Sequence, residues 1–153
     1  MTLPNAGGRS ENSEALSCDV LGTMFGARLI ATEMELKYWP LNSKITDFSV
    51  SIRGEVFGVS VTRAMKYAGT FTEADAYRLL TKKLLGVNAS TKAVLKRFRW
   101  QKQILHVWAE YKYIAHVLEN VYESLSEEVR HNTLVVVTVC ENAPWVFYQR
   151  ENR

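Results

Sequence analysis

The strongest structural signal in the chain lies in residues 44–63, KITDFSVSIRGEVFGVSVTR. Two runs rich in β-branched and aromatic residues flank Arg53-Gly54. A glycine suits a tight turn between strands because it tolerates positive φ at no steric cost. The pattern therefore predicts a β-hairpin with one strand over 45–52 and the next over 55–63.

The register of this hairpin follows from its turn. If Arg53 and Gly54 form the turn, Phe48 pairs with Val59, Val50 with Phe57 and Asp47 with Ser60. A residue and its opposite partner project from the same face, as do residues two apart on one strand. We therefore expect Asp47, Ser60 and Thr62 to share one face of the sheet.

A helix and a short strand are predicted before the hairpin. Apolar residues recur every three or four positions from a cap at Asn12 or Ser13 to about Ile30, which predicts one long helix with a buried apolar stripe. Gly22 and Gly26 would leave two bare patches on one face of that helix, suited to close packing against a sheet. Residues 33–38 alternate polar and apolar as in a short strand that Pro40 ends, and a continuation of the helix is the alternative.

The segments after the hairpin are predicted from caps and periodicity. We expect a helix that begins at Thr72 and ends at Gly86, a basic turn or short helix over 90–99, and a buried strand over 103–108. A helix over 110–130 precedes the most apolar strand, 133–140, which its composition places at the centre of the sheet. A last short strand is predicted over 145–148.

This order of elements predicts the α/β class, with a mixed β-sheet flanked by helices. We expect a flexible leader over residues 1–11, a single domain over 12–149 and a tail over 150–153. No glycine-rich phosphate loop follows any predicted strand, which argues against a doubly wound nucleotide-binding domain.

The same order resembles the core of the PD-(D/E)XK, or restriction-endonuclease-like, superfamily of nucleases and Holliday-junction resolvases. That core is a long helix, three consecutive strands, a helix and a further strand (αβββαβ). The resemblance covers residues 12–108 and is carried by KITDFSV (44–50) and GVSVTR (58–63). It implies a restriction-endonuclease-like core with an additional helix and strand, and a homodimer would suit it.

The resemblance also implies an active site. In the family, an acid near the start of the second strand and an acid on the third bind Mg²⁺, and a lysine two residues later positions the attacking water. Carboxylates suit this task because a hard cation prefers oxygen ligands and offsets the charge that phosphodiester cleavage develops. Asp47 matches the first acid, and Glu14 matches a further acid frequent on the first helix, with Asp19 behind it.

The motif is degenerate at two positions, which leaves three interpretations open. Ser60 and Thr62 stand where the second acid and the lysine are expected. The domain is then a nuclease-like protein that has lost catalysis, needs no cofactor and binds nucleic acid, which is the function we expect. Alternatively, it is an active Mg²⁺-dependent nuclease whose acids have migrated, for instance to Glu33, Glu35 or Glu55, or the resemblance is architectural and the chain is a protein-interaction subunit of a larger assembly.

Charge is unevenly distributed along the chain. Nineteen Lys and Arg against sixteen Asp and Glu give a net charge of +3, and no acid interrupts the basic stretch after Asp75 until Glu110. A solvated helix face or a phosphate-binding surface would account for this stretch. The residues predicted to bind nucleic acid are Lys82, Lys83, Lys92, Lys96, Arg97, Arg99 and Lys102, with Arg63 as a contributor. Phe98, Trp100 and Trp108 nearby either stack on bases or belong to the core.

Several other classes of site have no support in the sequence. No apolar run approaches the roughly 20 residues that cross a membrane. Cys18 and Cys140 lie far apart without a zinc or disulfide pattern, which favours a reducing compartment, so we expect an intracellular protein in the cytoplasm or nucleus. His106, His116 and His131 fall on different predicted elements and are expected to be packed or solvated rather than metal ligands.

Overall fold

The computed structural model describes residues 10–148, which form a five-stranded sheet between helices. In chain order the elements are α1 (Ser10–Phe25), β1 (Arg28–Thr32), β2 (Phe48–Ile52), β3 (Glu55–Ala64), α2 (Glu73–Ala93), the 3₁₀ turn η1 (Lys96–Phe98), β4 (Lys102–Ala109), α3 (Lys112–Ser124), α4 (Glu127–Arg130), β5 (Thr133–Val139) and the 3₁₀ turn η2 (Pro144–Val146). The strands lie in the order β1-β2-β3-β4-β5, antiparallel from β1 to β3 and parallel from β3 to β5. The predicted α/β class and mixed sheet are confirmed.

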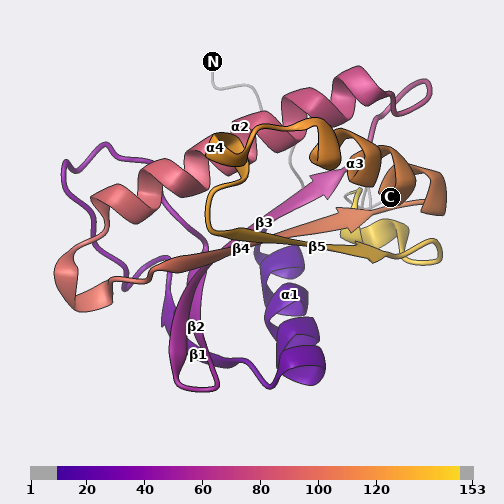
Figure 1. Ribbon diagram of the computed structural model, residues 1–153. Helices are drawn as coiled ribbons and strands as arrows, with labels where there is room; N and C mark the ends of the chain where they lie inside the picture. Colours follow the sequence, from indigo (N-terminus) through magenta and orange to yellow (C-terminus); the bar gives the residue numbers. More distant parts are fainter. Residues whose placement is uncertain (1–9, 149–153) are drawn as a thin grey trace, which may run out of the picture.

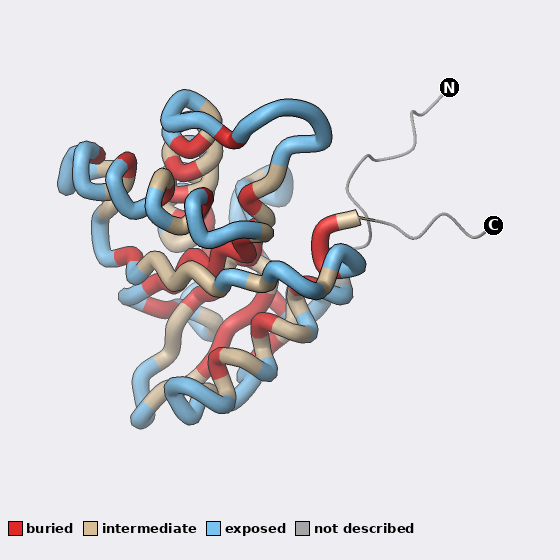
Figure 2. The backbone as a smooth tube through the Cα atoms, turned by 90° about the vertical axis from the view of Figure 1, so that its right-hand side faces the viewer, coloured by how far each residue is buried: buried red, intermediate tan, exposed pale blue. Residues whose placement is uncertain are grey.

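Two apolar clusters separate the helices from the sheet. α2 and α3 cover one face and α1 covers the other (Figure 1). Leu80 and Leu84 of α2 meet Leu105 and Val107 of β4 on the first face. On the second face, Leu21 of α1 joins a cluster built from β2, β3 and β4. Strand β4 is the most continuously buried element, and buried residues gather in the interior of the tube while exposed ones lie on its outside (Figure 2).

The hairpin has the predicted register. Phe48 pairs with Val59 and Val50 with Phe57, and the two turn residues Arg53 and Gly54 have φ of 51° and 82°. Left-handed backbone at both central residues is the geometry of a type I′ turn, whose twist matches that of the flanking strands.

Helix α1 is shorter than predicted. It ends at Phe25 because Gly26 adopts a φ of 66° and turns the chain into β1, so residues up to Ile30 are not helical. Gly26 therefore lies beyond the helix, and the predicted pair of bare patches on one helix face is wrong. The first turn begins at Ser10, so the predicted leader 1–11 is wrong at residues 10–11, whereas residues 1–9 and the predicted tail 150–153 lie outside the described range.

The buried face of α1 is also different from the predicted apolar stripe. Ser13, Ser17 and Leu21 are buried at four-residue spacing, while Met24 is 64% exposed. Ser17 is buried as a hydrogen-bonding group rather than as an apolar one. Its hydroxyl accepts from the Trp108 indole at 2.8 Å and lies 2.7 Å from Nδ1 of His106.

The strand predicted over 33–38 is wrong. The strand before the hairpin is β1 (Arg28–Thr32), and residues 33–35 form a turn in which the N–H groups of Glu35 and Leu36 both donate to the carbonyl of Thr32. Leu29 and Ile30 read as buried helix positions in the sequence, but they are exposed because β1 is the outer strand of the sheet.

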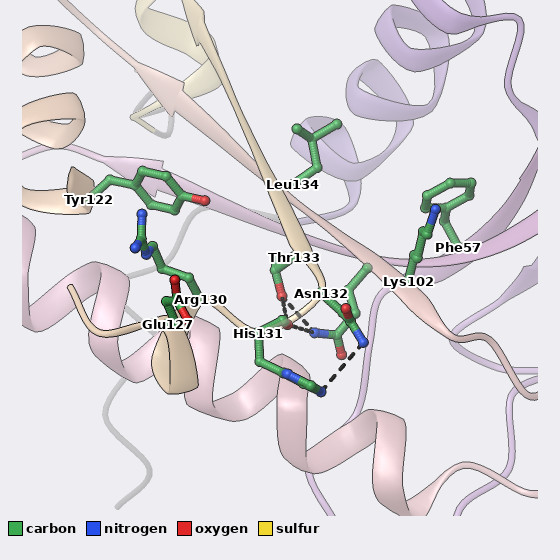
Figure 3. Close-up of a pocket in the computed structure, with 10 residues that line it drawn as sticks. Phe57, Lys102, Tyr122, Glu127, Arg130, His131, Asn132, Thr133 and Leu134 are labelled. Carbon is green, nitrogen blue, oxygen red and sulfur yellow. Dashed lines mark hydrogen bonds between the residues drawn. The ribbon is translucent and has the colours of Figure 1, made fainter.

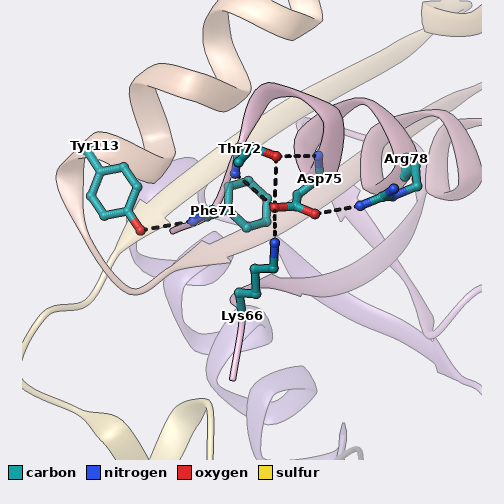
Figure 4. Close-up of polar contacts among 6 residues, drawn as sticks. All are labelled: Lys66, Phe71, Thr72, Asp75, Arg78 and Tyr113. Atoms are coloured by element: carbon teal, nitrogen blue, oxygen red, sulfur yellow. Dashed lines mark hydrogen bonds and ion pairs between the residues drawn. The ribbon is translucent and has the colours of Figure 1, made fainter. Parts of the chain in front are cut away.

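Helix α2 begins at its predicted cap and continues past its predicted end. Thr72 and Asp75 form a reciprocal capping box, and Lys66 and Arg78 both bind the Asp75 carboxylate (Figure 4). These contacts lower the pKa of Asp75. The helix passes through Gly86 to Ala93 because Val87 and Ser90, on the far side of the glycine, are buried against the fold. Gly86 is therefore not a stop.

Three predictions for the C-terminal third are corrected. The helix over 110–130 is divided at Leu125 into α3 and α4, and Ser126 caps the second piece by accepting the Val129 N–H. Strand β5 is at the edge of the sheet, not at its centre, and its apolar composition reflects helices and loops that cover both of its faces. Residues 144–146 form a 3₁₀ turn, where a strand was predicted over 145–148.

Candidate functional site: a carboxylate cluster beside basic clefts

Three carboxylates from three separate segments converge at one end of the hairpin. Glu14 comes from α1, Glu33 from the turn after β1, and Asp47 directly precedes β2. One carboxylate oxygen from each residue lies within 4.8 Å of the others. Glu14 and Asp47 were predicted to act together, and Glu33 was one of the acids considered as a migrated ligand. Glu35 and Glu55 do not belong to this cluster.

The end of strand β2 explains why Asp47 is held in place. Phe48, the first residue of β2, pairs with Val59, so β3 continues beyond its partner. The N–H of Val61 would be left unpaired there, and Oδ2 of Asp47 accepts it at 2.6 Å. The N–H of Asp47 in turn donates to the Val59 carbonyl at 3.0 Å. Asp47 is thus fixed through both its backbone and its side chain.

The electrostatic environment of Asp47 favours a cation. Burial, and to a smaller extent the carboxylates of Glu14 and Glu33, raise the pKa of Asp47 from 3.8 to about 6, against the opposing effects of the Val61 N–H and Lys83. Like charges this close repel each other unless a proton or a cation lies between them. At neutral pH, above its pKa of about 6, Asp47 is mainly ionised and adds its negative charge to a site with two other carboxyl groups.

The donor set fits a hard divalent cation. Mg²⁺ and Ca²⁺ take carboxylate oxygens, and neighbouring oxygens in a Mg²⁺ shell lie about 3 Å apart. Oxygens already within 4.8 Å of one another need to move little to reach that spacing. Glu14, Glu33 and Asp47 would hold the ion, which would supply Lewis-acid chemistry at a bound phosphate.

Hydroxyl residues stand at the two degenerate positions, and a lysine from another element lies beside them. Ser60 lines a cleft of about 360 Å³ together with Lys44, Lys82 and Lys83. Thr62 lines an adjoining cleft of about 300 Å³, again with Lys83. Lys83 therefore faces both clefts and lies close enough to Asp47 to lower its pKa. The ammonium group of Lys83 comes from α2, whereas the family resemblance implies a lysine on the third strand, at the position of Thr62 in β3.

The position of Lys83 beside Asp47 was not predicted from the sequence, in which Lys83 belongs only to a general basic surface. Its spacing was the available signal, because Lys83 follows Ala76 and Leu80 at the three- and four-residue intervals of the inward face of α2. A lysine on an otherwise apolar inward stripe is unusual. It indicates a cation aimed at the sheet.

The predicted nucleic-acid surface is divided into two groups. Lys82 and Lys83 lie beside the carboxylate cluster, whereas Lys92, Lys96, Arg97, Arg99 and Lys102 lie at the far end of α2 and in the segment that follows it. Ten helical residues separate Lys82 from Lys92, which corresponds to about 15 Å. In the second group, Lys102 pairs with Glu55 at 3.7 Å. Only the first group borders the cluster.

Arg63 is held at the side of this site. Its guanidinium donates to the carbonyls of Val146 at 3.4 Å and Phe147 at 3.3 Å, which ties β3 to η2. It also lines the cleft that contains Thr62 and Lys83. Arg63 therefore contributes positive charge to the rim from a fixed position.

The tryptophans of the basic stretch belong to the core. Trp100 is 2% and Trp108 4% exposed, so neither can stack on a base. His106 is packed as predicted, with Nε2 2.7 Å from the Thr138 hydroxyl, and burial lowers its pKa to about 4. His116 and His131 are exposed on other elements, and no group of three metal ligands within 10–148 includes a histidine.

Comparison with known proteins finds one relative with an uninformative name. The chain is 45% identical over 155 residues to the "AAC-rich mRNA clone AAC4 protein" of Dictyostelium discoideum, in an alignment that covers 96% of this chain and 22% of that protein. The chain thus spans about a fifth of its relative. No family model matches the chain, and no solved structure matches it. Within the described part of the chain, no helix is both long and apolar enough to span a membrane.

Proposed function

We propose that this domain is a metal-dependent phosphodiesterase that cleaves nucleic acid. The observation that carries the proposal is the convergence of Glu14, Glu33 and Asp47 within 4.8 Å beside Lys83. Acids that bind a divalent cation, next to cations that bind phosphate, are the two components that metal-assisted phosphodiester cleavage requires.

The topology supports a restriction-endonuclease-like core for this enzyme. The chain order is one helix, three antiparallel neighbouring strands, a helix and then a strand parallel to the third. The family that the sequence resembles has this order of elements, and Asp47 lies at the start of the second strand, where the resemblance places the first acid. Glu33 takes the part of the acid that Ser60 cannot supply, and Lys83 that of the lysine missing at Thr62.

Each group has a defined task in this proposal. The three carboxylates bind the cation, and Asp47 is mainly ionised above its pKa of about 6, so it binds metal at neutral pH without first losing a proton. Lys44 and Lys82 line the cleft that contains Ser60, and they bind the phosphates of the nucleic-acid strand. Lys83 lines the same cleft and lies close enough to Asp47 to lower its pKa, so its ammonium group is placed to stabilise charge that develops on the scissile phosphate.

A second candidate is a nuclease-like domain that binds nucleic acid without cutting it. It is favoured by Ser60 and Thr62, which carry no charge at the positions where the resemblance requires an acid and a lysine. This candidate uses the same basic clefts and predicts binding that weakens steeply with salt, because each neutralised phosphate releases counterions.

A cleavage assay separates the two. End-labelled single-stranded and duplex DNA and RNA are incubated with the protein in Mg²⁺, Mn²⁺ or EDTA and resolved on denaturing gels. We expect cleavage that requires the divalent cation and that is lost in Asp47→Asn, Glu14→Gln and Glu33→Gln. Asp19→Asn removes an exposed acid from α1 and serves as the matched control, with cleavage retained.

Each result decides between the candidates. Salt-sensitive binding with intact strands in every metal would overturn the enzyme and support the binding domain. Neither binding nor cleavage, with the protein folded by circular dichroism, would overturn both. Cleavage that survives Asp47→Asn would show that the carboxylate cluster is not the active site.

A further inference from the structure

A second pocket lies at the opposite end of the sheet from the carboxylate cluster. It has a volume of about 470 Å³ and opens where β3 and β4 begin and where α4 leads into β5 (Figure 3). Phe57 and Leu134 line it from the strands, and Arg130 and His131 line it from the end of α4. We propose that this pocket binds a small phosphate monoester whose organic part is aromatic or apolar.

Buried hydrogen bonds make one wall of the pocket rigid. Gln103 is 1% exposed, and its Nε2 donates to the Thr133 hydroxyl at 2.6 Å, to the Asn88 side chain at 2.8 Å and to the His131 carbonyl at 3.2 Å. Its backbone N–H donates to the carbonyl of Asn132. The loop 131–133 is therefore fixed before any ligand arrives, which lowers the entropic cost of binding.

Arg130 is presented to the pocket with hydrogen-bonding capacity to spare. Its guanidinium lies 5.3 Å from the centre of the Tyr122 ring, and the two side chains lie together in Figure 3. Its Nε is buried and finds no acceptor among the residues of the described range. Buried donors are nearly always paired in folded proteins, so the Nε–H of this stacked arginine is an unusual donor that still lacks an acceptor.

The other polar groups of the pocket favour an anion. His131 and Asn132 lie next to Arg130, with Nδ2 of Asn132 3.4 Å from Nε2 of His131. Lys102 lines the far side, where it also pairs with Glu55 at 3.7 Å across the surface. Glu127 is the one carboxylate in the lining. Cationic and amide donors therefore outnumber the acid, and they are the groups that bind phosphate oxygens, with arginine best suited to a bidentate contact.

The shape and the remaining walls define the rest of the ligand. A pocket of about 470 Å³ lies within the range of small-molecule sites. Phe57, Tyr122 and Leu134 offer aromatic and apolar surface beside the donors. A bare phosphate would leave these walls uncovered, whereas a nucleoside monophosphate would use both parts of the pocket.

Isothermal titration with adenosine monophosphate, adenosine and inorganic phosphate tests this assignment. The titrations use Asp47→Asn protein in EDTA, so the result does not depend on the proposed nuclease activity. We expect adenosine monophosphate to bind at least tenfold more tightly than either fragment. Arg130→Gln should weaken it at least tenfold, and Arg130→Lys less. Lys112→Gln removes an exposed cation outside the pocket and should leave the affinity unchanged.

Several outcomes would overturn the assignment. They are no heat of binding for adenosine monophosphate at millimolar concentration, equal affinity for adenosine, equal affinity for phosphate, or an affinity that Arg130→Gln leaves unchanged. Loss of binding in Lys83→Gln but not in Arg130→Gln would place the ligand in the clefts beside the carboxylate cluster and would also refute it. Far-ultraviolet circular dichroism of Arg130→Gln and Arg130→Lys establishes that both variants fold.

Discussion

Replacing Asp47 with asparagine should stabilise the folded protein above pH 7 while it removes one proposed metal ligand. The pKa of this carboxyl rises from 3.8 to about 6 in the fold, first because of burial and then because of Glu14 and Glu33. The folded state therefore binds the proton more tightly than the unfolded state does. Stability is lost as the pH rises from about 4 to 6, and the loss is complete above that range.

The size of the effect follows from the pKa. One pKa unit corresponds to ~1.4 kcal/mol, so the rise from 3.8 to about 6 amounts to roughly 3 kcal/mol at pH 8. Asparagine carries no charge, and its oxygen can still accept the Val61 N–H that Asp47 accepts at 2.6 Å. The variant should therefore lose the repulsion and keep the hydrogen bond.

Urea denaturation at pH 4 and pH 8 measures the effect as a difference between proteins. Burial lowers the pKa of His106 to about 4, which destabilises the fold as the pH falls below 6.5, the opposite direction from Asp47. This term is common to wild type and Asp47→Asn and cancels in the comparison. We expect the variant to be roughly 2–3 kcal/mol more stable at pH 8 and nearly equal at pH 4.

Asp19→Asn, an exposed change of the same charge, controls for net charge and should alter stability little at either pH. An Asp47→Asn variant that is less stable than wild type at pH 8, with the control unchanged, would contradict this prediction. That result would mean that Val61 and Lys83 stabilise the ionised carboxylate more than burial and its acidic neighbours destabilise it.

Three further predictions test the site and the core. At pH 8 and at a hundred times its Kd, Mg²⁺ should stabilise the folded wild type by ~2.7 kcal/mol, and its melting temperature in differential scanning fluorimetry should rise. The melting temperature of the Asp47→Asn variant should not change. Ser17→Ala removes the acceptor of the buried Trp108 indole and should lower the free energy of unfolding in urea by about 1–3 kcal/mol, where no change would contradict the contact. Gly58→Ala places a Cβ into the Trp100 ring and should lower the free energy of unfolding by about 1–3 kcal/mol. Gly86→Ala meets open space within a helix and should raise the free energy of unfolding by about 0.5–1 kcal/mol. Changes of the same sign in the two variants would contradict these placements.

Features set by neighbouring residues were predictable from the sequence. The hairpin turn, its register and the cap of α2 at Thr72 depend on local backbone preferences and on side chains three residues apart. The inward face of α1 was not predictable, because Ser13 and Ser17 look like surface residues until the partners of the second are known. Polar burial is a tertiary property that hydrophobic periodicity cannot detect.

The candidate site shows the same division. Asp47 and Glu14 were found from the resemblance, but Glu33 could be placed beside them only once β1 was known to end at Thr32. In the predicted strand over 33–38, the side chain of Glu33 would project from a face of the sheet, whereas in the structure Glu33 lies in the turn that follows β1. The position of Lys83 relative to Asp47 depends on how α2 crosses β3. Apolar packing between segments that are distant in sequence determines this crossing.

The serine-lined face of α1 has a consequence for how the domain tolerates change. Apolar side chains pack without directional preference, so a helix held by them alone can rotate a little about its axis. Ser17 instead engages His106 and Trp108 of β4 at 2.7 and 2.8 Å, one turn of helix after Glu14. Because hydrogen bonds are directional, these two contacts fix the rotation of α1 about its own axis. A substitution of the buried Ser17 should therefore rotate α1 and displace the Glu14 carboxylate from the cluster, although residue 17 is not itself part of the site.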